Sequence, residues 1–222
     1  MDVLYFLEGR TRFIRYYYET AATSFLDIQH KIENEEPPYN DPPWDDSGEP
    51  AFLDEFLTAE DGLMILGRSC LSLVSGSISL YFSAWEQELG IALDDAHRKH
   101  LFKKGVLPGY RAIFEHYLSN SWTESPADLA ILEQVILARN TDQHAGHITS
   151  LQAYYSASDS KKHPNLFFVR EEERDLDPSS AGSLFYGSNL TVTRDALFRA
   201  IDELEKLARW LEPLLLKLRW GR

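Results

Sequence analysis

A repeating pattern of apolar residues near the C-terminus is the strongest constraint on the fold of this 222-residue chain. After Thr193, apolar residues recur at three- or four-residue intervals: Leu197, Ile201, Leu204, Ala208, Leu211, Leu215 and Leu218. This spacing places them on one face of an α-helix that Thr193 is suited to cap. A long helix with one apolar face has to bury that face, so the sequence predicts a helical bundle.

Helix signals and helix breaks divide the rest of the chain. They predict helices over residues 2–34, 58–90, 95–105, 110–118 and about 126–155. The acidic, proline-containing segment 35–50 is predicted to be a loop. Two short pieces, Leu166–Val169 and Leu190–Thr193, are predicted to form a hairpin. The expected fold is mainly α, an up-down helical bundle in a single domain (residues 1–222) with a small two-strand β element before the C-terminal helix.

Composition indicates a reducing, aqueous environment. The single cysteine, Cys70, excludes a disulfide within the chain. The N-terminus has an acidic residue, Asp2, and no basic region before an apolar one, unlike a signal peptide. The most apolar segment, Leu63–Trp85, contains Arg68 and several serines, which favours a buried core helix over a membrane span. We therefore expect a cytoplasmic protein with no membrane partner.

Acidic residues are concentrated in one part of the chain. The formal net charge of −13 argues against a general nucleic-acid-binding protein. Residues 32–67, however, contain 11 acidic residues and no lysine or arginine, so the remainder is nearly balanced. A basic cluster follows: His97, Arg98, Lys99, His100, Lys103, Lys104 and Arg111. It is either a solvated helix face or a nucleic-acid-binding surface. The acidic loop is either a solvated linker or an arm that masks this cluster.

One predicted helix gathers several chemically capable side chains. Arg139 and Asn140 are followed by His144, and His147 comes almost one turn later. At 100° per residue, Asn140, His144 and His147 share one face, and the long side chain of Arg139 can reach it. A polar cluster that interrupts an apolar helix is typical of a functional site.

Arginine–histidine spacing alone does not identify such a site. Arg111 and His116 stand at the same spacing, but Ala112 follows the arginine and the surrounding helix is short and apolar. We interpret this second pair as structural or surface-exposed, although Arg111 can still bind a phosphate.

Arg139, the adjacent polar Asn140 and His144 resemble the motif of the HEPN superfamily of small α-helical domains. The resemblance covers Leu63–Leu218, and its specific part is Arg139–Gly146. It implies a metal-independent endoribonuclease of a toxin–antitoxin or anti-phage defence system. It also implies a homodimer whose two motifs line one cleft, controlled by an antitoxin or another regulatory protein. One subgroup has a tyrosine where Gly146 stands, so regulation through that tyrosine is not expected.

RNA supplies its own nucleophile, the 2′-OH, so a cleavage site needs only proton transfer and charge stabilisation. Histidine titrates near neutral pH, so His144 can take or give a proton. Arg139 offers donors that match phosphate oxygens, and Asn140 can orient His144 or bind the phosphate. The products would carry a 2′,3′-cyclic phosphate and a 5′-hydroxyl. Further RNA contacts are expected from His147, Arg98, Lys99, Lys103, Lys104 and Arg111.

Other interpretations remain open at this point. The motif can be a structural polar network in a non-catalytic HEPN-like module: a scaffold, an antitoxin-type partner or a nucleotide-binding domain. The net charge favours that alternative. The histidine pairs 144/147 and 97/100 can also be ligands in an unrelated metalloenzyme. No carboxylate occupies a matching position on the motif helix, so we predict no metal and no cofactor.

Overall fold

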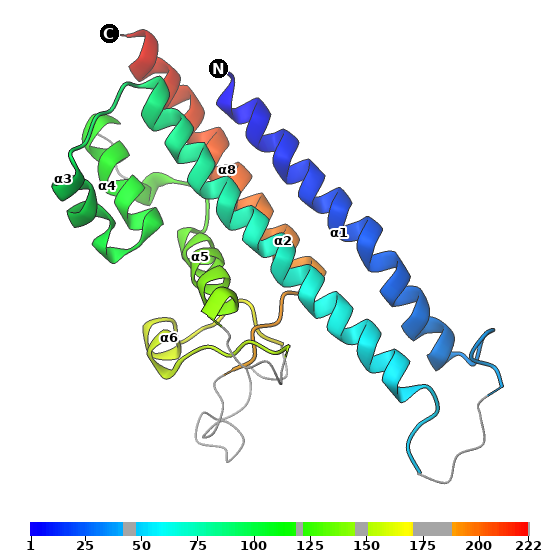
Figure 1. Ribbon diagram of the computed structural model, residues 1–222. Coiled ribbons are helices and arrows are strands. Elements are labelled where there is room, and N and C mark those ends of the chain that lie inside the picture. Colours follow the sequence, from blue (N-terminus) through cyan, green and yellow to red (C-terminus); the bar gives the residue numbers. More distant parts are fainter. Residues whose placement is uncertain (42–47, 119–121, 145–150, 171–187, 222) are drawn as a thin grey trace.

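Three long helices form the body of the molecule (Figure 1). The computed structural model describes residues 1–41, 48–118, 122–144, 151–170 and 188–221. Helices α1 (Val3–Glu33) and α2 (Leu53–Glu88) run antiparallel, and α8 (Arg194–Trp220) packs against both. The two ends of the chain lie at the same end of this body (Figure 1). The predicted helical bundle is confirmed.

The N-termini of α8 and α2 follow different local rules. Thr193 caps α8 as predicted, since its Oγ1 accepts the N–H of Ala196 at 3.2 Å. α2 does not begin at residue 58, where the predicted helix starts. It begins at Leu53, directly after Phe52, whose backbone is left-handed (φ 60°).

Shorter helices cover the side of α2 that faces away from α1 (Figure 1). They are α3 (Asp95–Leu101), the 3₁₀ turn η1 (Phe102–Lys104), α4 (Val106–Leu118), the 3₁₀ turn η2 (Trp122–Glu124), α5 (Leu129–His144) and α6 (Ala157–Lys162). α5 packs against α2 and α8, and α4 packs against α8 and α5. α3 is capped by Asp94, whose side chain accepts the N–H of His97 at 2.8 Å.

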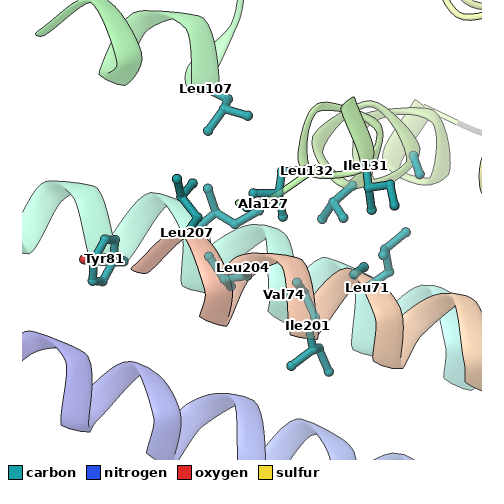
Figure 2. Close-up of a cluster of buried hydrophobic side chains, with 14 of the residues drawn as sticks. Leu71, Val74, Tyr81, Leu107, Ala127, Ile131, Leu132, Ile201, Leu204 and Leu207 are labelled. Carbon is teal, nitrogen blue, oxygen red and sulfur yellow. The ribbon is translucent and has the colours of Figure 1, made fainter. Parts of the chain in front are cut away.

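The apolar core lies where α2, α4, α5 and α8 meet (Figure 2). Leu71 and Val74 of α2 face Leu132 of α5 and Leu204 of α8, and each is at most 1% exposed. Burying one such side chain contributes roughly 1.5–3 kcal/mol. The core therefore fixes the position of α5, the helix that carries the motif.

Among the described helices, α2 is the one that could span a membrane by length and composition. Half of its most apolar stretch is buried inside the molecule, and a core helix of a soluble protein meets the same criteria. The cellular location stays a prediction.

The predicted two-strand β element, Leu166–Val169 with Leu190–Thr193, is wrong for the described residues. One backbone hydrogen bond joins the two segments, and the isolated bridge that does form joins Tyr154 to Asn189. A hairpin needs a ladder of such bonds. The apolar residues of the two segments are instead buried in the core: Leu166, Phe168, Val169, Leu190 and Val192.

The motif helix is also shorter than the predicted range, 126–155. It begins at Leu129 and ends at His144. Residues 151–156 are not helical, and their backbone forms hydrogen bonds with residues 188–190 in place of a helical ladder. The motif therefore occupies the end of α5 and not its middle.

Candidate functional site

The N-terminus of α5 is anchored to α8. Asp128 Oδ1 accepts the N–H groups of Ala130 (3.0 Å) and Ile131 (3.3 Å), and the Asp128 N–H donates to Glu203 Oε2 of α8 (2.8 Å). Burial raises the pKa of Glu203, but hydrogen bonds from Lys206 and Asp128 outweigh it and hold the pKa below its ordinary value. Glu203 is therefore an ionised anchor at neutral pH.

The inner face of α5 also holds a neighbouring segment. Its fully buried apolar residues include Leu132, Val135 and Ala138. Between them, the buried Gln134 donates from Nε2 to the Asn165 carbonyl (3.1 Å) and accepts the Phe167 N–H at Oε1 (2.6 Å). Both ends of this amide are satisfied, so Gln134 serves the fold.

Arg139 and Asn140 lie near the end of α5 and contact each other. Arg139 Nη1 donates to Asn140 Oδ1 at 3.0 Å. Asn140 is exposed and Arg139 is half-buried, and neither is in an ion pair with a described residue. Because Asn140 Oδ1 accepts from the arginine, the Asn140 amide and the other guanidinium N–H groups are the donors left for a ligand.

Asp142, two residues later, is held by α2. Arg68 Nη1 lies 3.2 Å from Asp142 Oδ1, and Arg68 Nη2 donates to the Leu151 carbonyl at 2.5 Å. The Arg68 side chain is 7% exposed, and its Nε has no hydrogen-bond partner among the described residues. Asp142 precedes residues 145–150 and Leu151 follows them, so Arg68 ties the chain on both sides of that segment.

A glycine beside this arginine permits a close approach of the chain to α2. A Cβ at Gly67 would lie 2.3 Å from the carbonyl oxygen of Val192. The segment that leads into α8 therefore rests directly on the α2 backbone, next to the Arg68–Asp142 pair. Any larger residue at position 67 has to displace it.

The two motif histidines are described only in part. His144 is the last residue of α5, and it follows Asn140 by about one helical turn, on the same face. The His144 side chain and all of His147 lie outside the described residues. Within the part of the chain that the structure describes, no three His, Cys, Asp or Glu side chains are placed to hold a metal ion.

The structure does not gather the basic cluster around Arg139. α3 and α4 lie beside the C-terminal end of α2, away from the motif end of α5 (Figure 1). Arg98 forms a two-bond ion pair with Glu86 (2.5 and 3.2 Å), and Arg111 pairs with Glu115 (3.0 Å). The exposed lysines of the cluster are Lys99, Lys103 and Lys104.

Sequence reasoning did not assign roles to Arg68, Asp142 or Gln134. A charged residue inside an apolar helix is a signal, because a buried charge requires a partner. Arg68 carries this signal. The signal did not identify Asp142, which is distant in sequence and carries no pattern of its own.

Comparisons with known proteins do not identify a family. No protein-family model, no curated protein and no solved structure matches the chain. The resemblance to the HEPN superfamily therefore depends on the motif and its helical setting alone.

Proposed function

We propose that this protein is a metal-independent endoribonuclease of the HEPN type. The supporting observation is a division of roles among neighbouring polar residues of α5. Gln134 and Asp142 are used by the fold, whereas Arg139 and Asn140 bond to each other and to no other described residue. A polar pair with free donors, at the end of a firmly anchored helix, is suited to bind a phosphate.

In the proposed reaction, the 2′-oxygen of RNA attacks the adjacent phosphorus and the bond to the 5′-oxygen breaks. The 2′-hydroxyl loses a proton and the departing 5′-oxygen gains one. His144 transfers protons in this step. Arg139 neutralises the charge that grows on the phosphate oxygens, and the Asn140 amide donates to the phosphate or orients His144. The products are a 2′,3′-cyclic phosphate and a 5′-hydroxyl.

The biological setting is part of the same proposal. A ribonuclease of this type would act in the cytoplasm as a toxin or anti-phage effector, restrained by an antitoxin or another regulatory protein. His147 and the exposed lysines of the basic cluster would contact RNA farther from the cleaved bond.

The test compares purified wild type, Arg139→Ala and His144→Ala on total RNA and tRNA in EDTA. Arg12→Ala is the control, since Arg12 is an exposed arginine of α1 that lies outside the proposed site and the basic cluster. We expect wild type and control to cleave RNA, and the two motif variants to lose at least about 100-fold in rate. Equal cleavage by all four proteins, or none by a folded wild type, would contradict the proposal.

A non-catalytic HEPN-like module is the second candidate, favoured by the net charge of −13. In such a module, Arg139 and Asn140 would bind a nucleotide or a partner protein without cleavage. Expression without a partner separates the two: wild type is toxic and Arg139→Ala harmless in the ribonuclease proposal, whereas both are harmless in the alternative.

A further inference from the structure

The outer face of α1 carries a strip of exposed aromatic side chains. The aromatic strip consists of Tyr5, Phe6, Phe13, Tyr16 and Tyr17, which are 41–67% exposed. By helical geometry these five positions fall within a sector of about 120°, on the side of α1 opposite its buried residues. An aromatic side chain has roughly 150–250 Å² of surface, so the strip exposes on the order of 500 Å². An apolar patch of this size on a soluble protein is often functional.

Two exposed arginines lie at the edges of the aromatic strip. The same helical geometry places Arg12 just outside one edge of the sector and Arg10 just outside the other. Arg10 Nε donates to Ser77 Oγ of α2 at 3.3 Å, and neither arginine forms an ion pair with a described residue. Both guanidinium groups are therefore available to an anionic partner that covers the strip.

The carboxylates near the aromatic strip are engaged elsewhere. Glu8 forms an ion pair with Arg209 of α8 at 2.8 Å. Glu19 forms an ion pair with Arg194, also of α8. Asp2 is the N-cap of α1. The strip therefore presents two positive charges and no carboxylate of its own, although the chain as a whole is acidic.

The acidic part of the chain lies toward the other end of α1 and α2. Residues 32–67 contain 11 acidic residues, and the last of them is Asp61. Asp61 lies about 24 Å along α2 from Ser77, the residue that contacts Arg10. This separation exceeds the Debye length of about 8 Å at physiological ionic strength. The net charge of −13 therefore does not prevent the strip from meeting a negative surface.

A groove opens in the middle of the aromatic strip, around Gly9. A Cβ placed at Gly9 would meet no atom within 4 Å. The groove has a volume of about 400 Å³, and its remaining lining residues are Tyr5, Phe6, Arg10, Arg12, Phe13, Ile14 and Leu73. Glycine inside a helix costs about 0.5–1 kcal/mol relative to alanine, and here it leaves a hollow with apolar walls and two guanidinium groups. Such a hollow suits a molecule that is apolar at one end and anionic at the other.

We propose that the outer face of α1 docks on the anionic phospholipid surface of a membrane, with the rings of the strip at the acyl boundary and Arg10 and Arg12 at the lipid phosphates. A helix that lies in the membrane–water interface has apolar and aromatic residues on one face and basic residues beside them. Tyrosine suits this depth, because its ring is apolar and its hydroxyl is polar. The groove at Gly9 gives an acyl chain room beside the two arginines.

Docking through α1 is separate from the proposed RNA cleavage. α5 and the shorter helices cover the side of α2 that faces away from α1 (Figure 1). RNA can therefore reach the motif while α1 lies on a membrane, and either proposal can fail without the other. The sequence prediction of no membrane partner considered spanning segments and signal peptides. The exposed strip becomes visible only in the folded chain, and peripheral docking through it replaces that prediction.

The test measures co-sedimentation of the full chain with lipid vesicles at physiological ionic strength. One set of vesicles is phosphatidylcholine alone, and the other is an equimolar mixture of phosphatidylcholine and phosphatidylglycerol. The variants are Arg12→Gln and Phe13→Gln. Leu26→Gln is the matched control for Phe13, since Leu26 is 53% exposed on α1 but lies off the strip. Lys99→Gln is the matched control for the lost charge, since Lys99 is exposed on α3.

We expect wild type and both controls to bind the phosphatidylglycerol vesicles, and to bind phosphatidylcholine alone more weakly. Arg12→Gln should weaken binding to the anionic vesicles about 5-fold. Phe13→Gln should weaken it at least about 10-fold, with helical content unchanged. A wild type that leaves the anionic vesicles unbound would overturn the proposal, including one that forms a dimer through this face. Equal binding by all of these proteins would overturn it too, because the contact would then lie elsewhere.

Discussion

α2 holds two neighbours by different physical means. Toward α8 the contact is apolar and distributed, with side chains such as Val74 and Leu204 fully buried. Toward the end of α5 it depends on few groups, above all the Arg68–Asp142 pair. Next to this pair, the segment that leads into α8 approaches α2 closely at Gly67. Truncating one core side chain costs about 2–5 kcal/mol but leaves the other core contacts in place. The position of the motif, in contrast, depends on individual residues, so it can be altered while the body stays folded.

Gly67→Ala should have the largest effect of the changes that test this comparison. The new methyl group would lie 2.3 Å from the Val192 carbonyl oxygen, so the segment before α8 must move. We expect the free energy of unfolding to fall by about 1–3 kcal/mol. Gly76→Ala is the matched control, because open space surrounds that position and alanine should stabilise the helix slightly. Urea denaturation of both variants checks the prediction, and equal effects would contradict it.

Arg68→Met should destabilise only the C-terminal end of α5, which carries the motif. It removes the donors to Asp142 and Leu151 with little change in side-chain length. An unsatisfied buried partner costs about 1–3 kcal/mol, and Asp142, at 28% exposed, recovers part of this from water. We expect faster amide hydrogen exchange over the last turns of α5 and unchanged exchange in α8. Similar acceleration of amide hydrogen exchange in α5 and α8 would contradict the prediction, because the end of α5 would then not open independently of α8.

Glu212→Gln should have the smallest effect. It tests the stability of the body formed by the three long helices. Burial raises the pKa of Glu212, although hydrogen bonds from Trp85 Nε1 (3.1 Å) and Tyr81 Oη (3.3 Å) lower it in part. A raised folded-state pKa means that wild type is most stable below the unfolded-state pKa and loses stability as pH rises through the folded-state value. Glutamine does not ionise, so the variant should melt about 1–3 °C higher at neutral pH and equal to wild type near pH 3. A difference independent of pH would contradict this.

Features that neighbouring residues determine were predicted better than features that depend on contacts between residues far apart in the sequence. Thr193 caps its helix as predicted, because a cap is a contact within three residues. The hairpin prediction was wrong because a short apolar segment has the same sequence pattern whether it pairs as a strand or is buried as a loop. The motif helix ends early because its continuation bonds to residues 188–190, a contact that no local pattern contains.

The candidate site shows the same limit. The hydrogen bond between the side chains of Arg139 and Asn140 joins neighbouring residues of one helix, so it needs no contact between distant parts of the chain. The support from Arg68 connects residues far apart in sequence and depends on how α2 packs on α5. The role of His144 stays a prediction.

Cleavage of a 2′-deoxy-substituted RNA tests the central claim most directly. A site is first mapped in an RNA oligonucleotide cleaved by wild type in EDTA, and the nucleotide that would supply the attacking 2′-hydroxyl is then replaced by its deoxy form. The account predicts that cleavage stops at that bond and that the unmodified RNA leaves 2′,3′-cyclic phosphate ends. Continued cleavage at the deoxy position, or products ending in a 3′-hydroxyl, would contradict it.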